Sequence, residues 1–356
     1  MAEMRATSLK TTAGNFFEDF RLGQVFEHAT PRTVTSGDVA LYQALYGPRF
    51  ALQSSDELAR ALGYPRAPID DLLVFHVVFG KTVPDVSLNA VANLGYADCR
   101  FLEPVYPGDT LATRSEVIGL KENSNHETGV VHVRSTGVNQ HGRPVLSYCR
   151  WVMVRKRDLL AAVATAHVPD LPDRVDPTSL SAALPVWRTE ASAWARSGSS
   201  ARLRDYAAGE RIDHVDGMTI EEAEHQMATR LYQNTAKVHF NQHTESQGRF
   251  KRRLVYGGVV ISLARALSFN GLANAVRIVA INGGRHVAPA FAGDTVYAWS
   301  EVIETAALPG RDDAGLLRLR TFATKNRPCT DFPGREAKGH ADGVILELDY
   351  WVAVPV

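Results

Sequence analysis

The 356-residue chain has no excess of either charge and no long apolar segment. Its 39 basic residues balance 39 acidic residues, whereas a surface that binds a nucleic-acid backbone needs clustered excess lysine and arginine. No apolar run approaches the roughly 20 residues that cross a bilayer, and the first residues lack the continuous apolar stretch of a secretory signal. We therefore expect a cytoplasmic protein that binds neither nucleic acid nor membrane.

Cysteine is also scarce. The three cysteines, Cys99, Cys149 and Cys329, lie far apart, without a Cys-x-x-Cys pair or a histidine at ligand spacing. This pattern predicts neither a disulfide framework nor a zinc site. We expect reduced thiols without a catalytic role, and no bound metal.

An internal duplication is the strongest pattern that is present. The segment from Arg100 to Ile118, RFLEPVYPGDTLATRSEVI, and the segment from Arg285 to Ile303, RHVAPAFAGDTVYAWSEVI, share nine of nineteen residues. Upstream of these segments, EDFRLGQVFEH of the first copy aligns with RDYAAGERIDH of the second. Downstream of them, RWVMV of the first copy aligns with YWVAV of the second. The second copy carries extra residues before its last strand, NRPCTDFPGREAKGHADG, whose composition suits an exposed loop.

Each copy contains an apolar helix followed by alternating strands. Residues 110–120, 130–139 and 145–155 alternate apolar with polar side chains and are separated by turn-forming sequences, which predicts an antiparallel meander. The preceding residues 70–82 and their equivalent 257–269 are apolar nearly all round, as expected of a helix wrapped by a sheet.

These elements predict an α+β double hotdog, in which each sheet wraps its own helix and the two sheets join edge to edge. We place one hotdog at residues 14–156 and the other at 201–356. Residues 157–200 are rich in Ala, Pro and Ser without a sustained period, and we expect a linker that spans rather than packs.

Only the second copy keeps groups suited to acid/base chemistry. Alignment of the copies places Pro48 opposite Asn234 and Gln53 opposite His239. Proline and glutamine cannot exchange a proton near neutral pH, whereas an imidazole can. Gly257 follows His239 at a helix start, where free backbone N–H groups could receive a developing oxyanion. The alternative is a polar histidine at a helix end and an asparagine in a turn.

The other histidines and glycine motifs have simpler interpretations. We expect His76 to be a core residue on the buried helix, and His225, near three glutamates, to lie on a solvated helix face. His28 and His214 occupy equivalent repeat positions and are interpreted as structural. The repeated Gly-Asp-Thr sequences predict turns that enter strands, and Asn282-Gly283-Gly284 lacks the trailing lysine of a phosphate loop.

The chain resembles the MaoC-like (R)-specific enoyl-CoA hydratases at QNTAKVH and YGG. It resembles the two-hotdog mesaconyl-CoA hydratases, or β-methylmalyl-CoA dehydratases, over nearly its whole length, including FHVVFGKTVPDVSLNAVANLGYA and RALSFNGLANA. The resemblance implies reversible hydration of mesaconyl-CoA to β-methylmalyl-CoA in the ethylmalonyl-CoA pathway. It implies no cofactor besides the CoA of the substrate.

The resemblance also assigns roles to individual residues. His239 matches the catalytic histidine, and Gly257 matches the glycine whose N–H holds the thioester oxygen. The position of the catalytic aspartate is Asn234, which cannot act as a base. Substrate-binding positions follow at Tyr256 and Gly258, and the cations Lys237, Arg252 and Arg253 are candidates for the substrate carboxylate or the CoA phosphates. These cations could equally form a solvated basic turn.

Two other functions on the same fold stay open, namely hydrolysis of an acyl-CoA thioester and non-catalytic acyl-CoA binding. The degenerate first copy is the reason to consider the second of these. A homodimer is one option for the oligomeric state.

Overall fold

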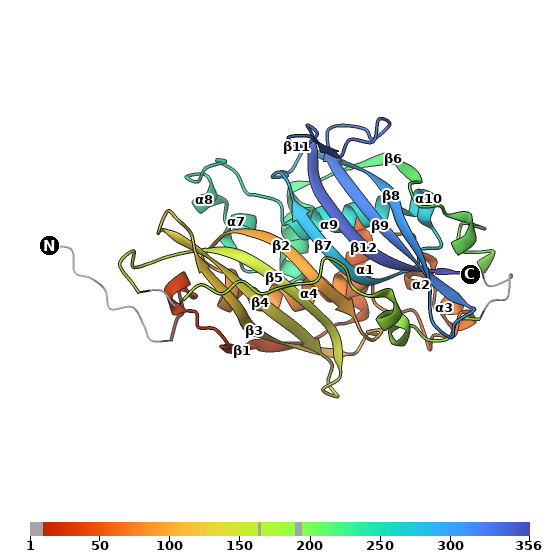
Figure 1. Cartoon of the computed structure of the whole chain (residues 1–356), viewed down its shortest axis with the longest axis horizontal. Helices are drawn as coiled ribbons and strands as arrows, with labels where there is room; N and C mark the ends of the chain where they lie inside the picture. Colours follow the sequence, from red (N-terminus) through yellow and green to blue (C-terminus); the bar gives the residue numbers. More distant parts are fainter. Residues whose placement is uncertain (1–9, 163–164, 189–193) are drawn as a thin grey trace.

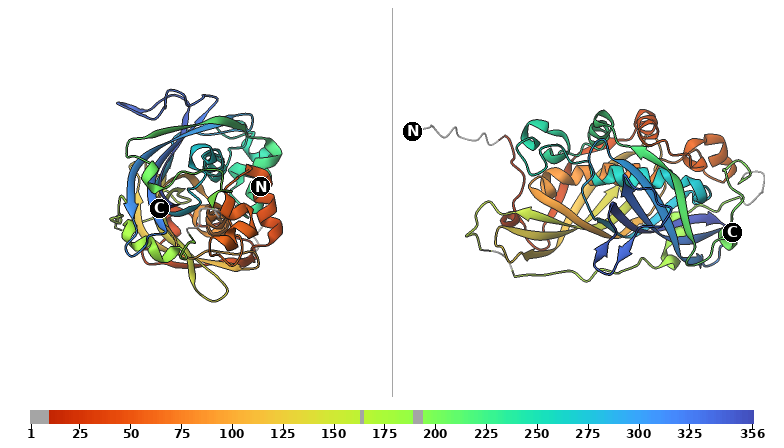
Figure 2. Two further views of the ribbon diagram at one scale, coloured as in Figure 1. Left: turned by 90° about the vertical axis from the view of Figure 1, so that its right-hand side faces the viewer. Right: turned by 90° about the horizontal axis from the view of Figure 1, so that it is seen from above.

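A computed structural model describes residues 10–162, 165–188 and 194–356. Ten strands form one antiparallel sheet in the order β1-β3-β4-β5-β2-β7-β12-β9-β8-β6. The sheet curves around the long helices, which lie along its concave side (Figures 1 and 2). The predicted α+β double hotdog is thereby confirmed.

The first half supplies one side of this sheet. Its helices and strands are β1 (Val25–Thr33), α1 (Ser36–Tyr46), α2 (Ala51–Ser54), α3 (Asp56–Ala61), α4 (Asp71–Thr82), β2 (Ala90–Phe101), β3 (Thr110–Glu122), β4 (Thr128–Val138) and β5 (Pro144–Arg155). Every residue of α4 is buried, because strands and neighbouring helices surround it. This explains why most of its side chains are apolar on every face.

The second half repeats the arrangement. Its elements are β6 (Arg211–Thr219), α6 (Glu222–Leu231), α7 (Lys237–Phe240), α8 (Gln242–Glu245), α9 (Gly257–Leu267), α10 (Phe269–Leu272), β7 (Arg277–His286), β8 (Thr295–Ala307), β9 (Ala314–Lys325), β10 (Arg335–Glu336), β11 (Gly339–His340) and β12 (Val344–Pro355). None of the helices in the described ranges has the length and hydropathy that a bilayer span requires.

The two halves join through β2 and β7. Tyr96 pairs with Gly284, and Cys99 pairs with Ile281, so an edge strand of each half bonds to the other as predicted and the two become the middle of the joined sheet. This pairing satisfies backbone groups that an isolated hotdog would leave at an open edge. The largest apolar core runs continuously from one half into the other.

Equivalent residues confirm the duplication. His28 bonds to Ser115 at 2.8 Å in the first half, and His214 bonds to Ser300 at 2.8 Å in the second. Across the junction, equivalent positions contact each other, since the Tyr232 hydroxyl lies 2.8 Å from the Tyr46 hydroxyl. The structural interpretation of His28 and His214 is thus supported by their hydrogen bonds.

The segment between the halves packs against the sheet, contrary to expectation. It crosses in front of the strands in Figure 1. Its apolar side chains Leu180, Leu184 and Trp187 are buried in one cluster with Trp351 of β12. The indole of Trp351 donates to the Val175 carbonyl at 3.2 Å. The segment lacks a sustained hydrophobic period because it follows an extended path across an apolar surface. The expectation of a linker that connects the two halves without packing on them is wrong.

The extra residues of the second copy form more than an exposed loop. They contain the short β10–β11 hairpin, and Cys329 and Ala341 are buried against Trp299. The indole of Trp299 donates to the Pro333 carbonyl at 2.8 Å. The insertion therefore covers an aromatic patch of β8 and β9.

Candidate active site

Asn234 lies between α6 and α7, and His239 lies within the short helix α7. The Asn234 side-chain oxygen accepts the backbone N–H of Ala236 at 3.0 Å, which starts the turn of α7 that carries His239. Asparagine favours such local side-chain-to-backbone bonds. With its Oδ1 engaged, the buried Asn234 amide retains its Nδ2 donors for a ligand. The spacing of five residues thus places an amide at the base of the helical turn that holds the imidazole.

The His239 ring is fixed in one orientation. Its Nδ1 donates to the Leu254 carbonyl at 2.9 Å, and Leu254 N–H in turn bonds to the Val238 carbonyl. This tautomer leaves Nε2 as a proton acceptor. Burial lowers the pKa of His239 to about 4, and the bond to Leu254 opposes that decrease. The imidazole is therefore neutral at pH 7 and able to take a proton.

Gly257 begins α9 and follows Tyr256, whose ring lies 5.5 Å from that of His239. The N-cap residue, Tyr256, provides no side-chain cap, so the first N–H groups of the helix remain for other acceptors. A Cβ at Gly257 would lie 2.3 Å from the ring of His286, and a Cβ at Gly258 would lie 2.5 Å from the ring of His76. Glycine is required at both positions because two imidazoles pack on the helix start.

His286 is a site residue that the sequence analysis missed. It ends β7, and its Nε2 lies 3.3 Å from the hydroxyl of Tyr96 in the first half. Burial lowers the pKa of His286 to about 4, and His239 contributes to the decrease. A signal was present in the duplication, because His286 stands where the first copy has Phe101.

The first half also holds the turn in place. At Gly80 of α4, a Cβ would lie 1.9 Å from the carbonyl oxygen of Tyr232. The next residue, Gln233, has a positive φ of 52° and accepts a bond from Lys81. The backbone beside Asn234 is therefore pressed directly against α4, and the candidate site belongs to both halves.

The corresponding place in the first half is closed. Asp71 stands where the second half has Gly257, and its carboxylate bonds to buried Arg277 at 2.7 Å and to the N–H of Ile278. Gln53, the counterpart of His239, donates to the Val276 carbonyl at 2.8 Å. A buried ion pair occupies this helix start, which agrees with chemistry in the second half alone.

The predicted substrate-binding residues differ in availability. Tyr256 is buried, and its ring lies 5.5 Å from that of His239. Lys237 is exposed, without an ion pair to any described residue, so it is available to a phosphate. Arg252 is exposed and lies over the Phe291 ring, at 4.9 Å. Arg253 forms an ion pair with Glu222.

The expectation that His225 lies on a solvated helix face is wrong. The His225 side chain is buried and lies 3.2 Å from the Glu222 carboxylate, so it does not belong to a solvated face. His76 is buried as expected, and its Nε2 lies 2.9 Å from the Ser262 hydroxyl.

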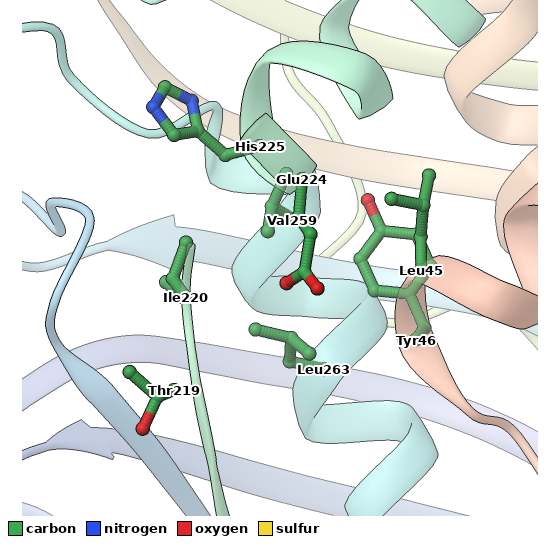
Figure 3. A pocket seen from close by; sticks show the side chains of 8 residues that line it. All are labelled: Leu45, Tyr46, Thr219, Ile220, Glu224, His225, Val259 and Leu263. Atoms are coloured by element: carbon green, nitrogen blue, oxygen red, sulfur yellow. The ribbon is translucent and has the colours of Figure 1, made fainter. Parts of the chain in front are cut away.

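A small cavity lies beside this site, between α1, β6, α6 and α9 (Figure 3). The Glu224 carboxylate points towards Leu263 in this view, and Val259 of α9 forms part of the wall. The cavity lining does not include His239, Asn234 or Gly257. Across the described ranges, no group of three or more His, Cys, Asp or Glu side chains could hold a metal ion.

Residues 3–337 match the family model for mesaconyl-CoA hydratase. The chain is 63% identical to the β-methylmalyl-CoA dehydratase of Chloroflexus aurantiacus, over 98% of the chain and 99% of that protein. It is 57% identical to the mesaconyl-CoA hydratase of Cereibacter sphaeroides, over 98% of the chain and all of that protein. The chain belongs to the mesaconyl-CoA hydratase family.

Solved structures agree with this family assignment. A MaoC domain dehydratase from Chloroflexus aurantiacus superposes with a TM-score of 0.95, at 63% identity over 98% of the chain and 99% of that structure. A double-hotdog protein of Mycobacterium tuberculosis gives a TM-score of 0.74 at 24% identity, over 97% and 99%, which supports the fold alone. This member of the mesaconyl-CoA hydratase family thus carries its acid/base candidates in the second of two fused hotdogs.

Proposed function

We propose that the chain catalyses the reversible hydration of mesaconyl-CoA to β-methylmalyl-CoA, in the ethylmalonyl-CoA pathway. The observation that carries the proposal is the placement of a neutral imidazole, His239, beside an uncapped helix start at Gly257, in a chain whose relatives bear these two names. No cofactor besides the CoA of the substrate takes part.

In this mechanism His239 Nε2 removes a proton from water as the oxygen attacks the β-carbon. The electrons of the double bond move towards the thioester, and the Gly257 N–H stabilises the resulting enolate oxygen. His239 then returns the proton to the α-carbon, which completes the addition of one water molecule. The Asn234 amide orients the water through its Nδ2 donors.

Asparagine at position 234 suits a substrate with a second carboxylate. In mesaconyl-CoA the carbon that receives water also bears this carboxylate. An aspartate at position 234 would place another negative charge a few ångströms away in a partly dry site, which is costly. An amide avoids the repulsion.

The activity is tested by incubating the protein with mesaconyl-CoA and crotonyl-CoA while following the absorbance of the conjugated thioester and the release of free thiol. Hydration lowers the absorbance without releasing thiol. Release of thiol would indicate a thioesterase instead, and binding with no change in either signal would indicate an acyl-CoA-binding protein.

Replacement of Asn234 by aspartate tests the charge argument. We expect turnover of mesaconyl-CoA to fall by about tenfold or more relative to that of crotonyl-CoA, because only the former suffers repulsion. The measurement is kcat/KM for both thioesters. An equal change for the two substrates would refute the charge argument, and Asn234→Ala distinguishes loss of the amide from added charge.

A further inference from the structure

Arg150 of β5 is a buried cation without a counter-ion among the residues that the structure describes. Its side chain is 1% exposed, and its guanidinium lies 4.2 Å from the centre of the Phe79 ring. Nη2 donates to the hydroxyls of Thr82 and Ser87, at 2.7 and 3.2 Å. Nε and Nη1 have no hydrogen-bond partner among the described residues, and no carboxylate in those ranges forms an ion pair with Arg150.

An uncompensated guanidinium in a protein interior is costly, because arginine stays charged and its N–H groups lose their bonds to water. A second unmatched group lies nearby, since the buried hydroxyl of Tyr148 also has no partner in the described part of the chain. Tyr148 and Arg150 are two residues apart on one strand, so both side chains project from the same face. Unmatched donors of this kind fit the oxygens of an anion.

Strand register places Arg150 next to the candidate active site. Arg150 pairs with Tyr96 across β5 and β2, and the Tyr96 hydroxyl contacts His286, which packs on Gly257. A second path leads through Phe79, whose ring also lies 5.6 Å from that of Tyr256. Burial raises the pKa of Tyr256, and the positive charge of Arg150 opposes the increase.

The second copy of the fold lacks this charge. Tyr350 occupies the equivalent position in β12, and its hydroxyl lies 3.0 Å from that of Thr321. An arginine is therefore not needed to build this strand of a hotdog. At this position of the repeat the first half has an arginine and the second half has a tyrosine.

We propose that Arg150, assisted by the Tyr148 hydroxyl, binds the free carboxylate of the substrate acyl group. This proposal rests on the proposed function and identifies the residue that selects a dicarboxylic over a monocarboxylic acyl-CoA. The thioester oxygen lies at Gly257, and the acyl group extends past Tyr256 towards Phe79. The substrate carboxylate completes the ion pair that the folded chain leaves open.

The test compares Arg150→Met with the unaltered protein on mesaconyl-CoA and on 2-methylcrotonyl-CoA, in which a methyl group replaces the carboxylate. We expect kcat/KM for mesaconyl-CoA to fall by roughly a hundredfold, the scale of a lost charge-assisted hydrogen-bond pair, and that for the neutral substrate to change by less than about threefold. Arg155→Met is the matched control, because Arg155 is exposed on the opposite face of the same strand. It should leave both values unchanged.

Succinyl-CoA and butyryl-CoA, which have no double bond to hydrate, test binding separately by calorimetry. The unaltered protein should bind succinyl-CoA more tightly, and Arg150→Met should lose this preference. The variant should also melt at a higher temperature, because the uncompensated charge is gone. Equal losses on both substrates, or an unchanged preference for succinyl-CoA, would overturn the proposal. Failure of the proposed function would appear instead in the unaltered protein, as no turnover of mesaconyl-CoA.

Discussion

Replacement of His239 by alanine is expected to reduce turnover of mesaconyl-CoA by about a hundredfold or more, the usual scale for a positioned acid/base group. The bond from Nδ1 to the Leu254 carbonyl fixes the tautomer in which Nε2 accepts a proton, and alanine removes that acceptor. The substitution leaves the Gly257 N–H, the proposed donor to the thioester oxygen, in place. We therefore expect kcat to fall much more than KM changes.

The measurement is the steady-state rate of absorbance loss. His243→Ala serves as the control, because His243 is an exposed histidine on the neighbouring helix α8 and should tolerate alanine without loss of rate. A rate close to that of the unaltered protein after replacement of His239 would remove this residue from the mechanism. Asn234 cannot replace it, since an amide does not exchange a proton near neutral pH.

A large loss of stability in acid is expected from buried neutral imidazoles. Burial lowers the pKa of His76 to about 3 and that of His214 to about 4. Unfolded histidine titrates near 6.5, so between pH 6.5 and 4 the unfolded chain binds more protons than the folded one. Stability is present above pH 6.5 and is lost as the pH falls, by about 3 kcal/mol for each imidazole at pH 4.

One group acts in the opposite direction. Burial raises the pKa of Asp70 to about 6, which adds stability as the pH falls from 6 towards 4, but the four imidazoles of lowered pKa, those of His76, His214, His239 and His286, outweigh one carboxyl. Denaturant unfolding from pH 7.5 to 4.5 measures the net effect. His214→Gln should reduce the pH slope by about one proton, and exposed His243→Gln should not. A slope near zero between pH 5 and 6 would contradict the expectation.

The duplication made most of the fold predictable. The strands at residues 110–120, 130–139 and 145–155 and both buried helices were located because their periodicity is local and strong. The sequence of the segment after β5 does not predict its packing, because the burial of its side chains depends on the sheet that it crosses. Val175 and Trp187 become core residues only when Trp351 and its neighbours provide an apolar surface.

The candidate site was only partly predictable for the same reason. His239, Asn234 and Gly257 lie within one short stretch, and their chemistry can be recognised from spacing. Tyr96 and His286 are 190 residues apart and meet only because β2 pairs with β7. His225 is buried because of tertiary packing. The acidic residues beside it in the sequence indicated a solvated helix face instead.

Because only the second half carries the candidate acid/base groups, the two halves of this chain can accept different substitutions. In a symmetric dimer of identical hotdogs, each substitution appears on both subunits, so an arginine that suits one side of the junction is imposed on the other. Fusion of the copies in one chain removes this coupling. Asp71 could fill one helix start while Gly257 kept the other free, and each half could then vary independently of its twin.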